Sequence, residues 1–224
     1  MPSIPLSEER SAANLAAPFL DLLPISGVAI LVFDEGGQQS TIYSSDRISA
    51  RLEEIQFDLG EGPVMDAFLS SETRQIGDVR AGTSGEWPLF VNALFDLPVA
   101  AIVAVPLVMG AACIGVALCY RSMTGEFDQE QHETASALGR AIAGPALRTA
   151  IRLAREGSQA EAGPPIELRR DVHQATGMVL AQLEVSATEA FARMRAHAFS
   201  SGRSLREISH DVLTHRLDFS ALPE

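Results

Sequence analysis

The N-terminal part of the chain shows a helical pattern followed by two strand patterns. Apolar residues are spaced for one helical face at Leu15, Phe19, Leu22 and Leu23, and the helix is predicted to begin near Ser7 and to stop before Pro24. A continuous apolar run over residues 26–33, a turn over 35–38 and an alternating segment over 39–45 follow. The pattern predicts an antiparallel hairpin behind a helix.

The next eighty residues alternate between short helical and strand patterns. Asp46 is a predicted N-cap for a helix through Ile55, and LGEGP interrupts the chain before another helix over 64–72. A short strand over 75–79, a loop, a helical segment over 87–97 and a buried hairpin over 100–107 and 112–120 follow. This order predicts an α+β fold, an antiparallel sheet flanked by helices.

A long helical pattern closes this part of the chain. It runs from Phe127 to about Arg155, and Pro145 is expected to kink it. Residues 156–165, EGSQAEAGPP, have little to bury and form the predicted linker. We therefore predict a first domain over 7–155 and a second, helical domain over 166–219.

The second domain opens with an amphipathic helix expected over 166–183. Its apolar face consists of Leu168, Val172, Ala175, Val179 and Leu183. The neighbouring face carries Arg169, His173 and Thr176, with Arg170 and Gly177 one step around the helix. Glycine within a helix costs about 1 kcal/mol relative to alanine, so Gly177 is expected to let another backbone or a ligand approach closely.

Two further helices open with predicted capping boxes. Ser186 is expected to pair with Glu189, and Ser204 with Glu207. Their predicted apolar faces are Ala190, Phe191, Met194 and Ala198 in one helix and Leu205, Ile208, Val212 and Leu213 in the other, with Arg193 and Arg195 pointing elsewhere. Such short amphipathic helices are stable only when packed together, which predicts a three-helix module.

The composition removes several classes of enzyme. All 17 basic residues are arginine, and without lysine the chain lacks the residue needed by a P-loop, a Schiff-base enzyme, a protein kinase or a receiver domain. Asp34, which ends an apolar strand, is therefore interpreted as a turn residue. Acidic pairs such as Glu61 and Asp66 have no partner histidine. We therefore predict that the chain has no catalytic site and no metal site, and that it is not an enzyme.

Cysteines and hydropathy indicate a soluble, cytoplasmic protein. Cys113 and Cys119 lie on one predicted strand, where they are expected to share a face about 20 Å apart and to form neither a disulfide nor a metal site. No apolar run approaches the roughly 18 to 20 residues of a membrane span, and no basic segment followed by an apolar one begins the chain.

Charge is unevenly distributed along the chain. The net charge is −12, yet residues 166–216 hold seven arginines against six acids, whereas residues 1–160 hold ten against twenty. Arg203, Ser204 and Arg206 stand at the start of the third helix, where free amides and the helix dipole favour an anion. Guanidinium groups pair with phosphate and stack on bases, but ordinary solvated arginines are the alternative.

The C-terminal segment resembles the ANTAR module, an RNA-binding antitermination domain. The matching residues are Ala175, Gly177, Ser186, Glu189, Ala190, Phe191, Arg195, Ala198, Leu205 and Ile208. Thr176 stands where lysine is common in that family, and Ser209 where alanine is usual. The resemblance implies that a homodimer binds hairpin loops of leader transcripts. The residues then expected to bind RNA are Arg169, Arg170, His173, Thr176, Gly177, Arg203, Ser204 and Arg206.

Residues 7–155 are similar to a GAF domain of the kind found in actinobacterial regulators. The resemblance rests on FDLGEGPVMDAF, WPLF and AAIVAVPLVMGAACIGVALCY. It implies an unknown small ligand under the covering loops, with no defined cofactor. Val64 stands where many relatives have cysteine, which argues against thiol sensing there. Trp87 and Phe90 either line this pocket or plug the core beneath the loop.

These features predict a transcription antitermination regulator that binds hairpin RNA under control of a ligand-sensing domain. An alternative is a ligand-gated DNA-binding or protein-interaction regulator that uses residues 204–216 as a recognition helix, although that helix devotes most of its apolar residues to packing. A third reading is a sensor whose C-terminal helices serve dimerisation alone.

Overall fold

A computed structural model describes the backbone of residues 6–34, 39–81, 85–157 and 164–221. Side chains are described for these residues except 6–11, 156–157, 164–170, 173 and 188. The chain divides into two compact units, Met1–Ala160 and Glu161–Glu224. Each unit is considered by itself below.

The first unit is built on an antiparallel sheet whose strands follow the order β2-β1-β5-β4-β3. The described strands are β1 (Gly27–Phe33), β2 (Gln39–Ser44), β3 (Arg74–Ile76), β4 (Ala101–Met109) and β5 (Ala112–Arg121). Every residue of β1 is buried, because this strand lies between two others and both of its faces are covered. The two hairpins predicted from the apolar runs, β1–β2 and β4–β5, are confirmed.

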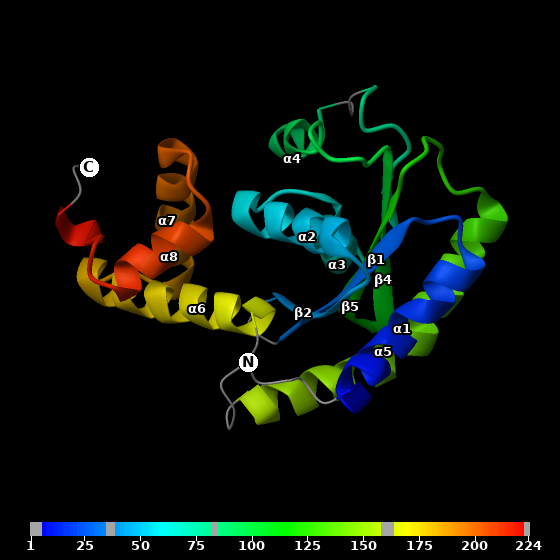
Figure 1. The fold of residues 1–224 in the computed structure, drawn as a ribbon, viewed down its shortest axis with the longest axis horizontal. Helices are drawn as coiled ribbons and strands as arrows, with labels where there is room; N and C mark the ends of the chain where they lie inside the picture. Colours follow the sequence, from blue (N-terminus) through cyan, green and yellow to red (C-terminus); the bar gives the residue numbers. More distant parts are fainter. Residues whose placement is uncertain (1–5, 35–38, 82–84, 158–163, 222–224) are drawn as a thin grey trace. The chain divides into compact units, whose positions relative to one another are not determined.

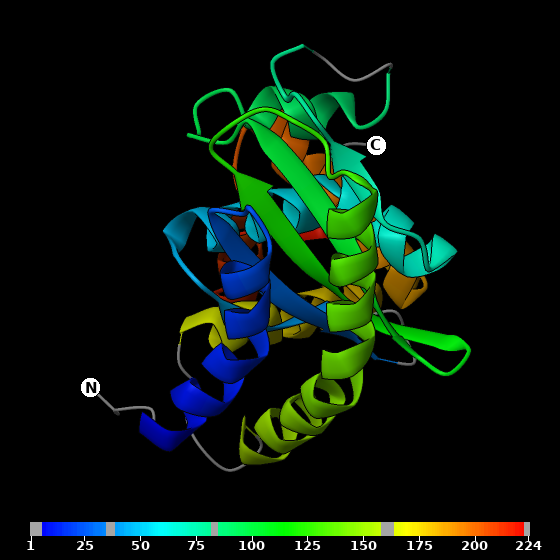
Figure 2. The same cartoon turned by 90° about the vertical axis from the view of Figure 1, so that its right-hand side faces the viewer.

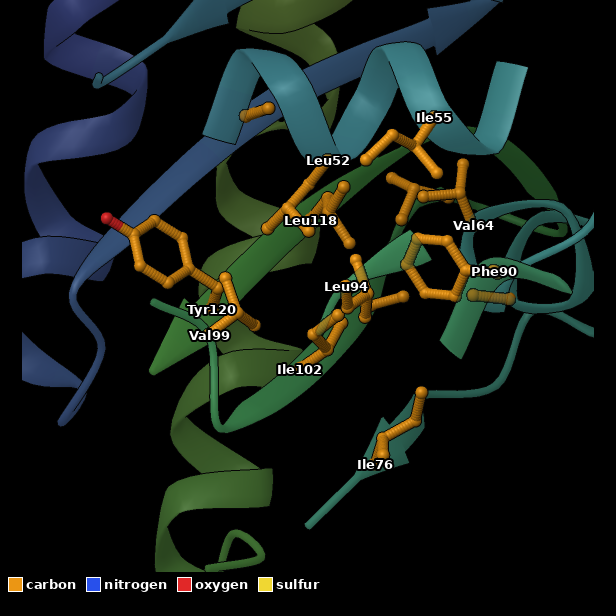
Figure 3. Packing of buried hydrophobic residues seen from close by; sticks show 14 of the residues in the cluster. Leu52, Ile55, Val64, Ile76, Phe90, Leu94, Val99, Ile102, Leu118 and Tyr120 are labelled. Carbon is orange, nitrogen blue, oxygen red and sulfur yellow. The ribbon is translucent and has the colours of Figure 1, made fainter. Parts of the chain in front are cut away.

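Helices cover both faces of the sheet (Figure 1). Their bounds are α1 (Leu6–Leu22), α2 (Arg47–Leu59), α3 (Pro63–Ser70), α4 (Pro88–Ala93) and α5 (Gln129–Gly157). One core lies between the sheet and α2, α3 and α4, with Leu52, Val64, Phe90 and Leu118 among its members (Figure 3). The other lies between the sheet and α1 and α5, and includes Phe19. The predicted α+β fold is confirmed.

Local signals mark the ends of α2, which starts at the predicted cap but continues to Leu59, beyond the predicted end at Ile55. Asp46 caps α2 by accepting from the backbone N–H groups of Ile48 and Ser49 at 2.7 and 2.8 Å. Gly60 ends α2 in the left-handed conformation that glycine adopts without strain. Pro145 lies inside α5, and the helix changes direction along its length (Figure 2).

The two cysteines do not share a face of the sheet as the sequence predicted. Gly115 pairs with Leu107, but Cys113 pairs with Val108, so β5 has one extra residue relative to β4 at this point. A bulge of this kind reverses the alternation of faces. Cys119 therefore packs in the core beneath α1 and α5. Cys113 lies on the other side, where its thiol is hydrogen-bonded to Ser71 at the end of α3.

The second unit contains the three predicted helices. They are α6 (Pro164–Leu183), α7 (Ala187–Ser201) and α8 (Leu205–Leu213), followed by the 3₁₀ turn η1 (Phe219–Ala221). Fully buried apolar side chains fill the space between these helices, among them Ala175, Val179, Ala190, Met194, Leu205, Ile208 and Val212. Gln182 accepts a hydrogen bond from the Phe219 N–H at 3.1 Å, which holds the C-terminal segment against α6. The predicted three-helix module is therefore present.

Candidate nucleic-acid interface

Short turns and side-chain caps set the positions of the three helices in the second unit. Ser186 accepts from the Glu189 N–H at 3.2 Å at the start of α7. The Glu189 carboxylate does not complete the predicted box, because it pairs with Arg193 at 2.7 Å. At α8 both bonds of the box between Ser204 and Glu207 form, as predicted.

The start of α8 is less open to an anion than the sequence indicated. The Ser204 N–H donates to the Glu207 carboxylate at 2.9 Å, and the Glu207 N–H donates to the Ser204 hydroxyl. Arg203 pairs with Asp211 at 2.6 Å and holds the pKa of that carboxyl below its ordinary value. Arg206 is exposed and forms no ion pair with any other residue that the structure describes. Of the predicted arginines at this turn, Arg206 is the one available to a phosphate.

Thr176 does not lie on the exposed face to which the sequence assigned it. Only 8% of the residue is exposed, and its hydroxyl donates to the Val172 carbonyl at 2.7 Å and contacts Met194 of α7. The reason is geometric, since Thr176 is next to the buried stripe of α6 and α7 packs over that edge. Its side chain belongs to the module's interior.

Gly177 lies on an open face of α6, and no other backbone of the described residues approaches it closely. A Cβ atom placed on it would meet nothing within 4 Å, and Gln174 and Ala181 on the same face are also exposed. The helix repeat places positions 170 and 173 on this face. The side chains of Arg169, Arg170 and His173 themselves lie outside the described residues. The described part of this face therefore has no side chain at its centre, where Gly177 stands.

The two arginines of α7 are engaged within the module. Arg193 pairs with Glu189, and the Arg195 guanidinium lies 5.5 Å from the centre of the Phe191 ring. Burial lowers the pKa of Arg195. Neither was assigned to nucleic-acid binding, and both confirm the prediction that they point away from the central core.

In the first unit the structure separates the roles of Trp87 and Phe90. Phe90 is fully buried in the core on the α4 side of the sheet (Figure 3). Trp87 is half-buried with φ of 50°, and its indole N–H donates to Asp66 at 3.0 Å. Phe90 matches the core-plug reading, while Trp87 tethers the start of α4 to α3.

Glu61 and Asp66, an acidic pair without a partner histidine, hold this loop in place. Glu61 accepts from the backbone N–H groups of Leu89 and Phe90 at the first turn of α4, and Asp66 accepts from Trp87. These contacts join residues more than twenty positions apart. Local spacing therefore does not predict them.

The described residues contain no group of three His, Cys, Asp or Glu side chains that could hold a metal ion. Within the described part of the chain, none of the helices combines the length and hydrophobicity required to cross a bilayer.

Comparison with known families identifies the second unit. Residues 166–213 match the family model of the ANTAR domain. We refer to these residues as the ANTAR module. The resemblance inferred from its three helices is thereby confirmed. A search of curated proteins found no match to this chain.

Solved structures similar to the chain align with most of their own length. A GAF domain/HD domain protein from Geobacter sulfurreducens is 14% identical, with 64% of this chain and 94% of that chain covered and a TM-score of 0.49. The PixJ GAF domain of Thermosynechococcus elongatus is 16% identical, with 72% and 100% covered and a TM-score of 0.43. A free methionine-R-sulfoxide reductase from Thermoplasma acidophilum is 15% identical, with 63% and 96% covered and a TM-score of 0.46.

Proposed function

We propose that this chain is a transcription antitermination regulator whose ANTAR module binds hairpin loops in nascent RNA. The match of residues 166–213 to the ANTAR domain carries this proposal. The exposed face of α6 around Gly177 and the exposed Arg206 at the start of α8 support it. Single-stranded loop bases can be contacted by small residues and arginine without a helix that enters a deep groove.

The charge of the module explains why a dimer is part of the proposal. Seven arginines face six acids between residues 166 and 216, and Arg193 and Arg203 are already paired with Glu189 and Asp211. Few positive charges are therefore left for phosphate contacts, and one module alone would bind weakly. Two modules that engage two hairpins on one transcript would gain affinity through their high effective concentration.

In this proposal the first unit is a GAF-like sensor that controls the module, and the chain performs no catalysis. A small ligand under the covering loops would change the geometry of the homodimer by binding one arrangement better than the other. The proposed route runs through α5, the last helix before the ANTAR module in the sequence. The ligand itself is not assigned by this part of the proposal.

A gel-shift comparison tests the proposal. The full chain is titrated against RNA with two hairpins, RNA with one hairpin, and duplex DNA of equal length. We expect the two-hairpin RNA to bind most tightly, and Arg206→Glu to weaken it by about tenfold or more with a smaller salt dependence, because a phosphate contact is replaced by repulsion. Arg47→Glu, an equally exposed arginine of the first unit, is the matched control.

Three outcomes would count against this function. A preference for duplex DNA would favour the DNA-binding alternative. Equal losses in the Arg206 and Arg47 variants would show that net charge alone matters. Unchanged nucleic-acid binding after Arg203→Glu and Arg206→Glu together would support a module that serves dimerisation only.

A further inference from the structure

The C-terminal half of α5 carries a cationic hollow that the proposed function does not use. Arg148, Ile151, Arg152 and Arg155 line an open hollow of about 350 Å³ in the first unit. The three arginines stand at positions i, i+4 and i+7 and therefore project along one side of the helix. The sequence between them, RTAIRLAR, contains no acidic residue.

Arg152 indicates that no anionic group of the described residues occupies this hollow. Its Nε and Nη2 atoms are buried and have no hydrogen-bond partner in the structure. A charged donor that is removed from water without an acceptor is strongly destabilising. An anion within the hollow would supply the missing acceptor oxygens.

The two neighbouring arginines reinforce this requirement. Arg148 and Arg155 are exposed, and neither forms an ion pair or hydrogen bond with the residues that the structure describes. Like charges one helical turn apart repel each other, so the stripe destabilises α5 unless a counter-charge is bound. The stripe lies in an acidic part of the chain, because residues 1–160 contain ten arginines and twenty acidic residues. Acids are abundant there, yet the sequence places none between these arginines.

The helix dipole accounts for one arginine of the three. Arg155 lies in the last turn of α5, which ends at Gly157, and a positive charge there is favourable. Arg148 and Arg152 precede that turn, where the dipole contributes little. The helix dipole therefore does not account for these two arginines.

We propose that this hollow binds a phosphate-bearing small molecule. Guanidinium groups bind phosphate oxygens through paired hydrogen bonds. The eight residues from Arg148 to Arg155 span about 10 Å along the helix, which suits a chain of two or three linked phosphates. Ile151, which is 45% exposed between the arginines, offers an apolar contact to an organic portion of the ligand. This site is independent of the proposed RNA contacts.

Calorimetric titration of the full chain with inorganic tripolyphosphate tests the site, with sulfate at equal ionic strength as the reference anion. The test variant is Arg148→Gln with Arg155→Gln, which alters exposed side chains and leaves the partly buried Arg152 in place. The matched control is Arg47→Gln with Arg140→Gln, two exposed arginines outside the hollow. We expect the dissociation constant to rise at least tenfold in the test variant and to stay within twofold in the control. Tripolyphosphate should also raise the thermal unfolding midpoint of the parent chain and of the control variant more than that of the test variant.

The proposal is overturned when tripolyphosphate binds no better than sulfate, or when both double variants lose affinity equally. A parallel titration with a single-stranded RNA oligonucleotide separates the other source of phosphate. If the test variant loses RNA affinity while tripolyphosphate does not bind the parent chain, the stripe belongs to a nucleic-acid interface. The proposal of a small-molecule site would then be wrong, whether or not Arg206→Glu weakens RNA binding.

Discussion

Thr176 and Gly177 are neighbours in α6, but their surroundings are opposite. The Thr176 hydroxyl bonds within the module, whereas a side chain at Gly177 would extend into open space. The arginines differ in the same way, because Arg203 is held by Asp211 while Arg206 has no ion pair among the described residues. Residue type alone therefore does not tell which polar groups of this module are available to a partner.

Gly177→Ala should separate stability from RNA binding. We expect the free energy of unfolding of the second unit to rise by up to about 1 kcal/mol, because alanine favours the helix and meets no neighbour. We expect hairpin affinity to fall severalfold, because the methyl group would stand between the α6 backbone and the RNA. Urea denaturation followed by circular dichroism and gel shifts measure the two effects.

Ser200→Ala, at an exposed position of α7, is the control for a substitution that leaves the α6 face unchanged. Hairpin affinity that stays level or rises with the stability of Gly177→Ala would show that RNA does not contact this face.

At the scale of elements, capping determines how securely α8 is held. Both bonds of the box between Ser204 and Glu207 are present, and α8 contributes Leu205, Ile208 and Val212 to the core. At α7 the box is half-formed because Arg193 competes for the Glu189 carboxylate. Local sequence predicted both helix starts but not this competition, which depends on side-chain partners one turn away.

Acid should weaken the second unit through α8. The backbone N–H of Ser204 lowers the pKa of Glu207 below 4.5, and the hydrogen bond from Arg203 lowers the pKa of Asp211 below 3.8. A carboxyl whose pKa is lowered by folding stabilises the folded state above its unfolded pKa and loses this contribution as pH falls through the folded pKa. We expect the thermal midpoint of the second unit to decrease below about pH 4.5.

Glu207→Gln with Asp211→Asn should flatten this acid dependence, while Glu184→Gln, an exposed acid in the same unit, should leave it unchanged. Thermal scans by circular dichroism from pH 6 to pH 2.5 provide the comparison. An equally steep decrease in all three proteins would place the titrating groups elsewhere.

At the scale of the whole molecule, the two units have separate cores. Leu118 is fully buried in the sheet of the first unit, and Ile208 is fully buried among the helices of the second. Each unit is therefore expected to fold on its own, as the proposed division into a sensor and an output module requires.

Calorimetry should resolve two unfolding transitions. Leu118→Ala and Ile208→Ala should each destabilise their own unit by about 2–5 kcal/mol, as expected for removal of a buried aliphatic side chain, and leave the other transition in place. A single transition displaced equally by both substitutions would contradict independent folding.

The sequence by itself determined the type and order of nearly every element, the helix caps at Asp46 and Ser204, the apolar stripes of α6, α7 and α8, and the ANTAR resemblance. These features depend on periodicity and on residues within one helical turn of each other. Tertiary structure alone decided the strand order β2-β1-β5-β4-β3, the bulge that separates Cys113 from Cys119, the burial of Thr176 and the tether of Trp87 to Asp66. Each of these depends on which distant segments meet, and packing rather than local pattern selects those contacts.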